Sequence, residues 1–203
     1  MPYDYEVFLS YRRHREWAHW VRNDFLPLFE HYLGEELAGS GPKIFFDVND
    51  IETGTAWPWK LANALARSKI LVCLWSRQYF SSPWCKAELS YMRARENRCR
   101  FGTLEKPEGL IVPVIIHDGE DLPAEEKITE PLRLADVVNV RMAPGSRKAE
   151  ELAERIEKWA PDVARAVHRA PDFDEEWQHL AAAVIGPLFR PPQAQTSVPS
   201  LDA

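Results

Sequence analysis

The chain alternates between short, unbroken apolar runs and longer stretches in which apolar residues recur every three or four positions. Unbroken runs are typical of strands covered on both faces, whereas the longer spacing is typical of amphipathic helices. The runs predict five strands, over residues 5–9, 43–47, 69–75, 110–116 and 136–140. Because helical segments separate most of these runs, we expect a parallel sheet covered by helices on both faces. In such a sheet the ligand crevice lies at the carboxyl ends of the strands.

Prolines interrupt several of these predicted elements. Pro27 falls within a helical pattern that begins near Trp17, and we expect it to kink or restart that helix. Pro113 falls inside the fourth strand, where its missing N–H requires an edge, a bulge or an unpaired neighbour. Residues 131–134 are expected to form one helical turn before the fifth strand.

The pattern changes beyond residue 145. Two further amphipathic patterns follow, and we expect Pro161 and Pro171 to separate them. After Arg190 the composition turns to Pro, Gln, Ser and Ala, which is typical of a disordered tail. The predicted organisation is a sheet domain over 1–145, a helical extension packed on it over 146–190, and a disordered tail over 191–203.

The clearest helix start in the chain lies just after the third predicted strand. Ser82 can accept the first free backbone N–H groups, and Pro83 fits the first helical position because its missing donor costs nothing there. At about 100° per residue, Trp84 and Glu88 share one stripe of this helix, and Cys85 lies on a neighbouring apolar stripe. The apolar stripe should face the core, which leaves Glu88 at its margin, beside the crevice. The alternative is an ordinary exposed glutamate beside a partly buried tryptophan.

Composition narrows the classes of function. A formal net charge of -6 over 203 residues argues against a general nucleic-acid or anionic-membrane binder but allows phosphate-bearing small molecules. Three cysteines without C-x-x-C spacing and six scattered histidines indicate neither a disulfide framework nor a metal site. No apolar run reaches the roughly 18 residues needed to span a bilayer, and the first residues lack a leader pattern. We therefore expect a cytoplasmic protein with no metal, no membrane partner and no direct nucleic-acid partner.

Four segments agree in order and spacing with one known family. They are Phe8-Leu9-Ser10-Tyr11-Arg12-Arg13, Phe45-Phe46-Asp47 with its Gly54-containing loop, Ser68-Lys69-Ile70, and Trp84-x-x-x-Glu88. With these segments the chain, over roughly residues 3–140, resembles a Toll/interleukin-1 receptor (TIR) domain. The resemblance implies a flavodoxin-like α/β fold with a central five-stranded parallel sheet. It also implies one of two roles, an NAD-cleaving enzyme of the bacterial type or a docking module that signals by assembly.

The resemblance places the reaction on one residue. In catalytic members a glutamate on the helix after the third strand carries the reaction, and by motif it maps onto Glu88. Breaking the bond between ribose and nicotinamide expels a neutral group from a cationic one, so no general acid is needed. One carboxylate can then stabilise an oxocarbenium-like transition state. NAD+ is the implied substrate, and no cofactor is implied.

Further contacts with substrate are expected where the first three strands end. The candidates are Ser10, Tyr11, Arg12, Asp47, Trp57 and Trp84. Arg12, with Arg13 as the weaker candidate, offers a planar donor fork to the pyrophosphate, and Trp84 offers an aromatic face to pyridinium or adenine. Residues 47–57 resemble the family's mobile loop, which covers the substrate or contacts the next subunit. Solvated surface arginines and simple core packing of Trp84 remain the alternatives.

Three functions are compatible with these residues. The first is a TIR enzyme that converts NAD+ to nicotinamide and ADP-ribose, or a cyclic isomer, in bacterial antiviral defence signalling. Its partners would be other TIR domains, through self-association, and a separate sensor or effector protein. The second is a non-catalytic adaptor that assembles with other TIR domains through residues 47–57, and the third is a nucleoside-processing transferase. No G-x-G-x-x-G follows a strand and no G-x-x-x-x-G-K-[ST] is present, which argues against dehydrogenases and nucleotide triphosphatases.

Overall fold

A computed structural model describes residues 3–38, 41–46, 57–119, 122–123 and 130–189. At its centre lies a five-stranded parallel sheet with the strand order β2-β1-β3-β4-β5. The strands are β1 (Tyr5–Tyr11), β2 (Ile44–Phe45), β3 (Ser68–Trp75), β4 (Ile111–Ile115) and β5 (Leu132–Arg133). The predicted parallel sheet is therefore confirmed.

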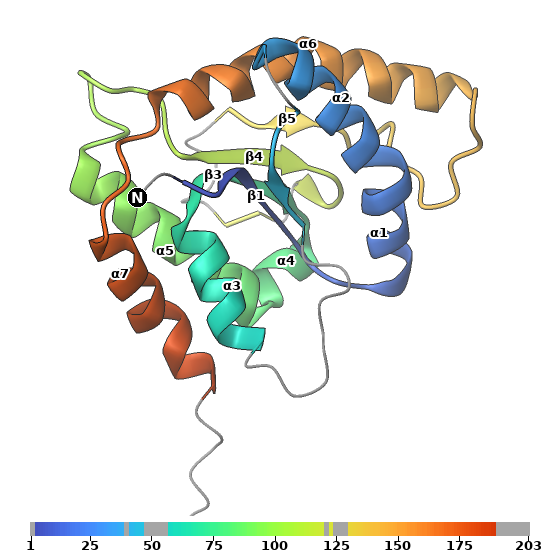
Figure 1. The fold of residues 1–203 in the computed structure, drawn as a ribbon. Helices are drawn as coiled ribbons and strands as arrows, with labels where there is room; N and C mark the ends of the chain where they lie inside the picture. The colour runs from blue at the N-terminus through green and yellow to red at the C-terminus, as the bar shows by residue number, and fades with distance from the viewer. Residues whose placement is uncertain (1–2, 39–40, 47–56, 120–121, 124–129, 190–203) are drawn as a thin grey trace, which may run out of the picture.

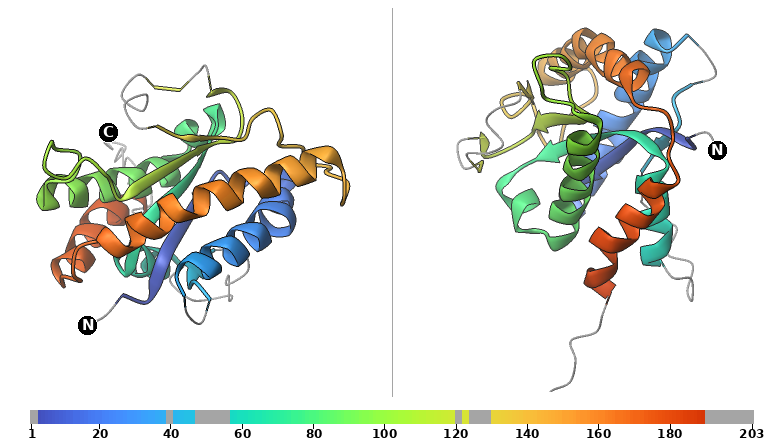
Figure 2. Two further views of the ribbon diagram at one scale, coloured as in Figure 1. Left: turned by 90° about the horizontal axis from the view of Figure 1, so that it is seen from above. Right: turned by 90° about the vertical axis from the view of Figure 1, so that its left-hand side faces the viewer.

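Helices cover both faces of this sheet, as the sequence predicts. They are α1 (Arg15–Trp20), α2 (Leu26–Glu36), α3 (Trp57–Ala66), α4 (Arg77–Ser81), α5 (Pro83–Cys99), α6 (Arg147–Arg169) and α7 (Glu176–Ile185), followed by a 3-10 segment (Gly186–Phe189). Helices α2 and α6 pack together over one face, and α3, α5 and α7 lie together on the other (Figures 1 and 2). None of the helices in the described part of the chain is long and apolar enough to cross a membrane.

The two central strands explain the unbroken apolar runs. β1 and β3 pair in register from Tyr5 opposite Ser68 to Tyr11 opposite Leu74, and both are covered by helices, so almost every side chain is buried. Because the strands are parallel, their carboxyl ends meet at one edge of the sheet. This edge carries Ser10 and the start of the segments that follow β3.

Pro27 and Pro113 behave as predicted. A π-helical segment (Val21–Phe25) joins α1 to α2, and Pro27 lies at the start of α2, where a missing N–H is tolerated. In β4, the C=O of Leu110 and the N–H of Ile116 bond to β3, so Pro113 faces the opposite side. There β5 pairs only with Val114 and Ile115. The missing N–H of Pro113 therefore breaks no ladder bond.

Three predictions about the second half of the chain are wrong. The fifth strand is Leu132–Arg133, whereas residues 136–140 form turns, and the helical turn expected over 131–134 is absent from these described residues. The hydrophobic run of 136–140 predicts a strand, but Val137 is buried from within a turn. Helix α6 also runs without interruption through Pro161. Its broad buried stripe offsets the lost hydrogen bond, and only Pro171 separates α6 from α7.

The two late helices are anchored to opposite faces of the sheet. In α6, Trp159 stacks on Phe29 of α2 with ring centroids 5.3 Å apart. In α7, Trp177 lies against the fully buried guanidinium of Arg95, whose carbon is 5.1 Å from the ring centroid. Both tryptophans are buried, so these helices contribute to one continuous core. The tail predicted to be disordered, residues 191–203, lies outside the described residues.

Candidate active site

Helix α5 presents Glu88 to the carboxyl edge of the sheet. Ser82 caps the helix, accepting the N–H of Cys85 at 3.4 Å, and Pro83 occupies the first turn, as predicted. One further turn along, Glu88 faces β1 and is only 7% exposed. The side chain is thus buried deeper than the crevice margin expected from the helical stripe.

The carboxylate of Glu88 accepts a short hydrogen bond from the end of β1. Ser10, at the end of β1, donates from Oγ to Oε2 of Glu88 at 2.5 Å. Burial raises the pKa of Glu88 to about 7, and the bond from Ser10 and the positive charge of Arg13 only partly oppose this rise. Glu88 therefore titrates near neutral pH, which is a feature of catalytic carboxylates.

Tyr79 completes a buried hydrogen-bonded cluster beneath this pair. It lies on the short helix α4, directly after β3, and has no exposed surface. Its hydroxyl is 3.0 Å from Oγ of Ser10 and 3.3 Å from the carbonyl oxygen of Cys85, so either can accept the phenol proton. Burial raises the pKa of Tyr79 well above its ordinary value, so the phenol stays protonated. The sequence analysis missed Tyr79, although its place after the third strand brings it to the same edge as Ser10.

A small cavity lies against Glu88. It has a volume of about 20 Å³ and is lined by Phe8, Leu9, Ser10, Tyr11, Arg13, Leu61 and Glu88. The structure thus brings three of the predicted residues together, Ser10, Tyr11 and Glu88. A space of this size holds about one water molecule, so a dinucleotide requires the lining residues to separate.

Other predicted site residues lie outside this cavity lining. Arg12 is exposed, and its Nη1 donates to Oγ of Ser82 at 3.5 Å, whereas Arg13 lines the cavity. Trp84 is half-buried and packs against the core. Asp47 lies outside the described residues. Trp57 begins α3, and its side chain is likewise outside the described part.

Cys85 is a packing residue, as its apolar stripe predicts. It is 3% exposed, and burial together with the nearby Glu88 raises the pKa of its thiol to about 12. A thiol with this pKa is almost entirely protonated at neutral pH and is a poor nucleophile. Within the described ranges no group of three or more His, Cys, Asp or Glu side chains is arranged to hold a metal ion.

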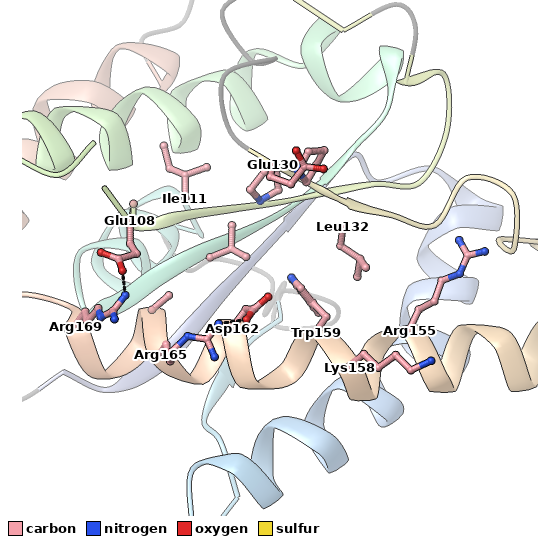
Figure 3. Close-up of a pocket in the computed structure, with 15 residues that line it drawn as sticks. Glu108, Ile111, Glu130, Leu132, Arg155, Lys158, Trp159, Asp162, Arg165 and Arg169 are labelled. Carbon is pink, nitrogen blue, oxygen red and sulfur yellow. Dashed lines mark hydrogen bonds and ion pairs between the residues drawn. The ribbon is translucent and has the colours of Figure 1, made fainter. Parts of the chain in front are cut away.

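A larger cavity of about 620 Å³ lies between β4, β5 and α6 and shares no lining residue with the Glu88 cavity (Figure 3). Its floor is apolar and includes Pro113 and Trp159. Several charged side chains at its rim form ion pairs, namely Arg169 with Glu108, Arg165 with Asp162, and Arg155 with Asp136. These pairs neutralise much of the rim charge, so the cavity offers no chemistry comparable with that at Glu88.

The chain matches the family model for the TIR domain over residues 7–157. TMV resistance protein N of Nicotiana glutinosa is 31% identical over 99 residues, which are 49% of this chain and 8% of that protein. The chain thus spans only 8% of the length of this curated relative.

Two solved structures are similar to parts of the chain. The TIR domain of the Toll-related receptor TRR-2 from Hydra magnipapillata matches with 19% identity and a TM-score of 0.45, over 65% of this chain and 86% of that one. The TIR domains of the activated Roq1 resistosome, which directly recognises the pathogen effector XopQ, match with 21% identity and a TM-score of 0.38, over 92% and 100%.

The family match begins within β1 and ends inside α6, so it includes most of β1, the other four strands and the residues that meet at Glu88. It covers well over half of the chain. On this match, the chain belongs to the TIR domain family.

Proposed function

We propose that this TIR domain is an NAD+ nucleosidase or cyclase that breaks the bond between nicotinamide and ribose. The observation that carries the proposal is Glu88, a carboxylate buried at the carboxyl edge of the sheet with a pKa raised to about 7. A desolvated anion held by a fixed donor suits a reaction in which positive charge develops on a sugar. No second carboxylate is needed, because the departing nicotinamide is neutral.

The reaction balances with the groups that this proposal names. The bond from ribose to nicotinamide breaks with its electrons going to nicotinamide, and the ionised Glu88 stabilises the oxocarbenium-like centre that remains. In hydrolysis, water adds to that centre and releases one proton, which gives ADP-ribose. In cyclisation, an adenine nitrogen of the same molecule takes the place of water. In both cases Glu88 must be ionised when the bond breaks.

The neighbouring side chains have proposed roles around this carboxylate. Arg13, which lines the cavity, and Arg12 beside it would pair with the pyrophosphate through their guanidinium groups. Tyr11, whose ring stacks on Phe46 with centroids 5.4 Å apart, would form one wall. Trp84 remains the proposed stacking surface for a flat ring.

Asp47 and Trp57 remain proposed contacts at the two ends of the segment between β2 and α3. The cavity at Glu88 is too small for a dinucleotide, so the residues that line it would separate before NAD+ enters. We propose that self-association with other TIR domains assists this opening, in a cytoplasmic signalling role that involves a separate sensor or effector. The name of the plant relative, a resistance protein, supports a setting in defence, and we propose bacterial antiviral defence for this chain.

Mass analysis of the products tests the proposal. The purified chain is incubated with NAD+ at pH 8, with and without a crowding agent that favours assembly, and nicotinamide and its co-product are identified by mass. We expect nicotinamide with ADP-ribose, or with a cyclic product lighter than ADP-ribose by one water, from the wild type and from Glu157→Gln. Glu157 is an exposed carboxylate on α6 and serves as the matched control. Equal release from Glu88→Gln would refute the assignment, and assembly without any turnover would indicate the adaptor function instead.

A further inference from the structure

The cluster beneath Glu88 contains fewer protons than oxygen atoms able to accept them. Ser10 and Tyr79 each carry one hydroxyl proton, and their oxygens lie 3.0 Å apart. Two further acceptors lie within reach, Oε2 of Glu88 at 2.5 Å from Ser10 and the carbonyl of Cys85 at 3.3 Å from Tyr79. Because a hydroxyl donates one proton at a time, the charge on Glu88 determines the direction of its bond with Ser10, and thereby whether Ser10 can donate to Tyr79 or only accept from it.

When Glu88 is ionised, it can only accept, so the single proton of Ser10 points to Oε2. Ser10 then has no proton left for Tyr79, so a bond between the two hydroxyls runs from Tyr79 to Ser10. The phenol proton has two acceptors within reach, and the shorter contact, 3.0 Å to Ser10 against 3.3 Å to the carbonyl of Cys85, favours Ser10. When Glu88 is protonated, the chain can reverse, running from Glu88 to Ser10, from Ser10 to Tyr79 and from Tyr79 to the carbonyl of Cys85. Neither arrangement leaves a buried hydroxyl proton without an acceptor.

We propose that Tyr79 is a positioning residue that acts on Glu88 through Ser10, by donating to Oγ of Ser10 and thereby directing the serine proton onto the carboxylate. Tyr79 itself makes no direct hydrogen bond to Glu88 among the described contacts. The hydrogen-bond chain stands independently of the reaction, and only its effect on turnover rests on the proposed function. A donor that itself accepts a hydrogen bond is polarised and donates more strongly.

Among the described residues, few other groups near Glu88 affect its ionisation. From the end of β1, Arg13 contributes a favourable positive charge. From α5, Cys85 is a neutral thiol at physiological pH, and from β3, Cys73 is fully buried behind Tyr79. From α3, Leu61 is apolar. Ser10 is thus the main uncharged group that favours the ionised carboxylate, and Tyr79 is the residue that fixes its direction.

A set of four variants separates this chain from mere packing. Ser10→Ala removes the donor to the carboxylate and should raise the pKa of Glu88 by about one unit or more. Tyr79→Phe keeps the ring but removes the donor to Ser10, and should raise the same pKa by about half a unit, since only the polarisation is lost. In Ser10→Ala with Tyr79→Phe, the second change should add nothing, because Tyr79 acts through Ser10. Ser10→Thr retains a hydroxyl and should restore the wild-type pKa.

The readout is the side-chain carboxyl carbon of Glu88, followed by NMR in protein labelled with ¹³C at glutamate and assigned by its loss in Glu88→Gln. Ser90→Ala, at an exposed serine of α5, and Tyr32→Phe, on α2, serve as controls and should leave the titration unchanged. If the pKa shift of the double variant equals the sum of the two single shifts, or if Ser10→Ala does not shift the pKa of Glu88, the proposal is overturned.

Activity is measured separately on the same proteins. If the proposed function holds, the pH at which kcat/KM reaches half of its maximum should move upward in the same order as the NMR titration. If the titrations shift as expected and no protein turns over NAD+, the hydrogen-bond chain stands and the proposed reaction fails. Thermal unfolding at pH 5 confirms that each variant is folded before either measurement.

Discussion

At the scale of the residue, the site depends on a carboxylate that burial and hydrogen bonding pull in opposite directions. Burial favours the neutral form of Glu88, whereas Ser10 and Arg13 favour the anion, and burial is the larger effect. The balance leaves the pKa close to the pH at which the protein would work. A catalytic acid or base works best when its pKa lies near the working pH. The dependence of turnover on the ionisation of Glu88 therefore tests its proposed role.

The first prediction concerns the pH dependence of turnover. If only the ionised Glu88 supports cleavage of NAD+, kcat/KM should rise with pH and level off above a midpoint near 7. Below the midpoint the rate should fall about tenfold for each pH unit. Initial rates of nicotinamide release between pH 5 and 9 measure this profile. A rate that is flat across that range would contradict a role for the Glu88 anion.

The second prediction concerns stability, for which the sign follows from the same pKa. The pKa of Glu88 is raised from 4.5 in the unfolded chain to about 7 in the fold, so the folded state holds this proton more tightly. The stabilisation is complete below about pH 4.5 and is lost as pH rises through 7. Between pH 5 and 8 the wild type should lose roughly 2–3 kcal/mol of unfolding free energy relative to Glu88→Gln.

Urea unfolding of the two proteins at both pH values measures this difference. Glu157→Gln, at an exposed carboxylate, should follow the wild type and so controls for the change of charge. A difference between wild type and Glu88→Gln that does not depend on pH would mean that Glu88 titrates normally in the fold.

At the scale of the element, the sequence predicted well wherever a local pattern decides the structure. The apolar runs placed β1 and β3 almost to the residue, and Ser82-Pro83 placed the start of α5. Strand β5 was missed because two residues paired with Val114 and Ile115 leave almost no local pattern. The helix break predicted at Pro161 is wrong because packing along the whole of α6 outweighs the loss of one backbone hydrogen bond at the proline.

In the site, too, residues marked by a local sequence pattern were predicted, whereas a contact between distant residues was not. The rule that a ligand crevice lies at the carboxyl ends of parallel strands brought Ser10, Tyr11 and Glu88 together correctly in one place. The sequence analysis favoured Arg12 over Arg13, whereas Arg13 is the one that lines the cavity; β1 ends at Tyr11, and the alternation of side chains that could have ranked them ends with it. The contact between Ser10 and Tyr79 joins residues 69 positions apart and has no local signal.

The third prediction belongs to the junction between α5 and β4. Oε1 of Glu96 accepts the backbone N–H groups of Leu110 at 2.5 Å and Ile111 at 3.0 Å, which begin β4. Glu96→Ala would leave both donors without this acceptor and should lower the unfolding free energy by roughly 1–3 kcal/mol. Glu96→Gln keeps an acceptor oxygen and should lose less. Equal stability of Glu96→Ala and wild type in urea unfolding would show that the bonds contribute nothing.

At the scale of the whole molecule, a buried arginine ties distant parts of the chain to the helix that carries Glu88. Arg95 of α5 donates to the carbonyl of Ser68 at 2.8 Å and to the hydroxyl of Tyr3 at 2.7 Å. Its guanidinium also packs against Trp177 of α7. Tyr3 in turn donates to the carbonyl of Pro171, in the connection between α6 and α7, at 2.9 Å. The late helices are therefore part of the support for the site.

The fourth prediction follows from this arrangement. Trp177→Ala should lower the unfolding free energy by about 3–5 kcal/mol, because it removes a large buried ring and uncovers the guanidinium of Arg95. Trp59→Ala, at a tryptophan that is 66% exposed on α3, should change stability by less than about 1 kcal/mol and is the matched control. Urea unfolding measures both. Equal effects of the two changes would show that α7 does not support the core.

The most direct test of the account is the rate of nicotinamide release by wild type and by Glu88→Gln at pH 8, where Glu88 is mostly ionised. Glutamine keeps the size and hydrogen-bonding capacity of the side chain but cannot carry the negative charge. If this charge stabilises the transition state, kcat should fall by about 10²–10³-fold, the range typical of a lost preorganised electrostatic group. A kcat for Glu88→Gln within a few-fold of the wild type would contradict the central claim.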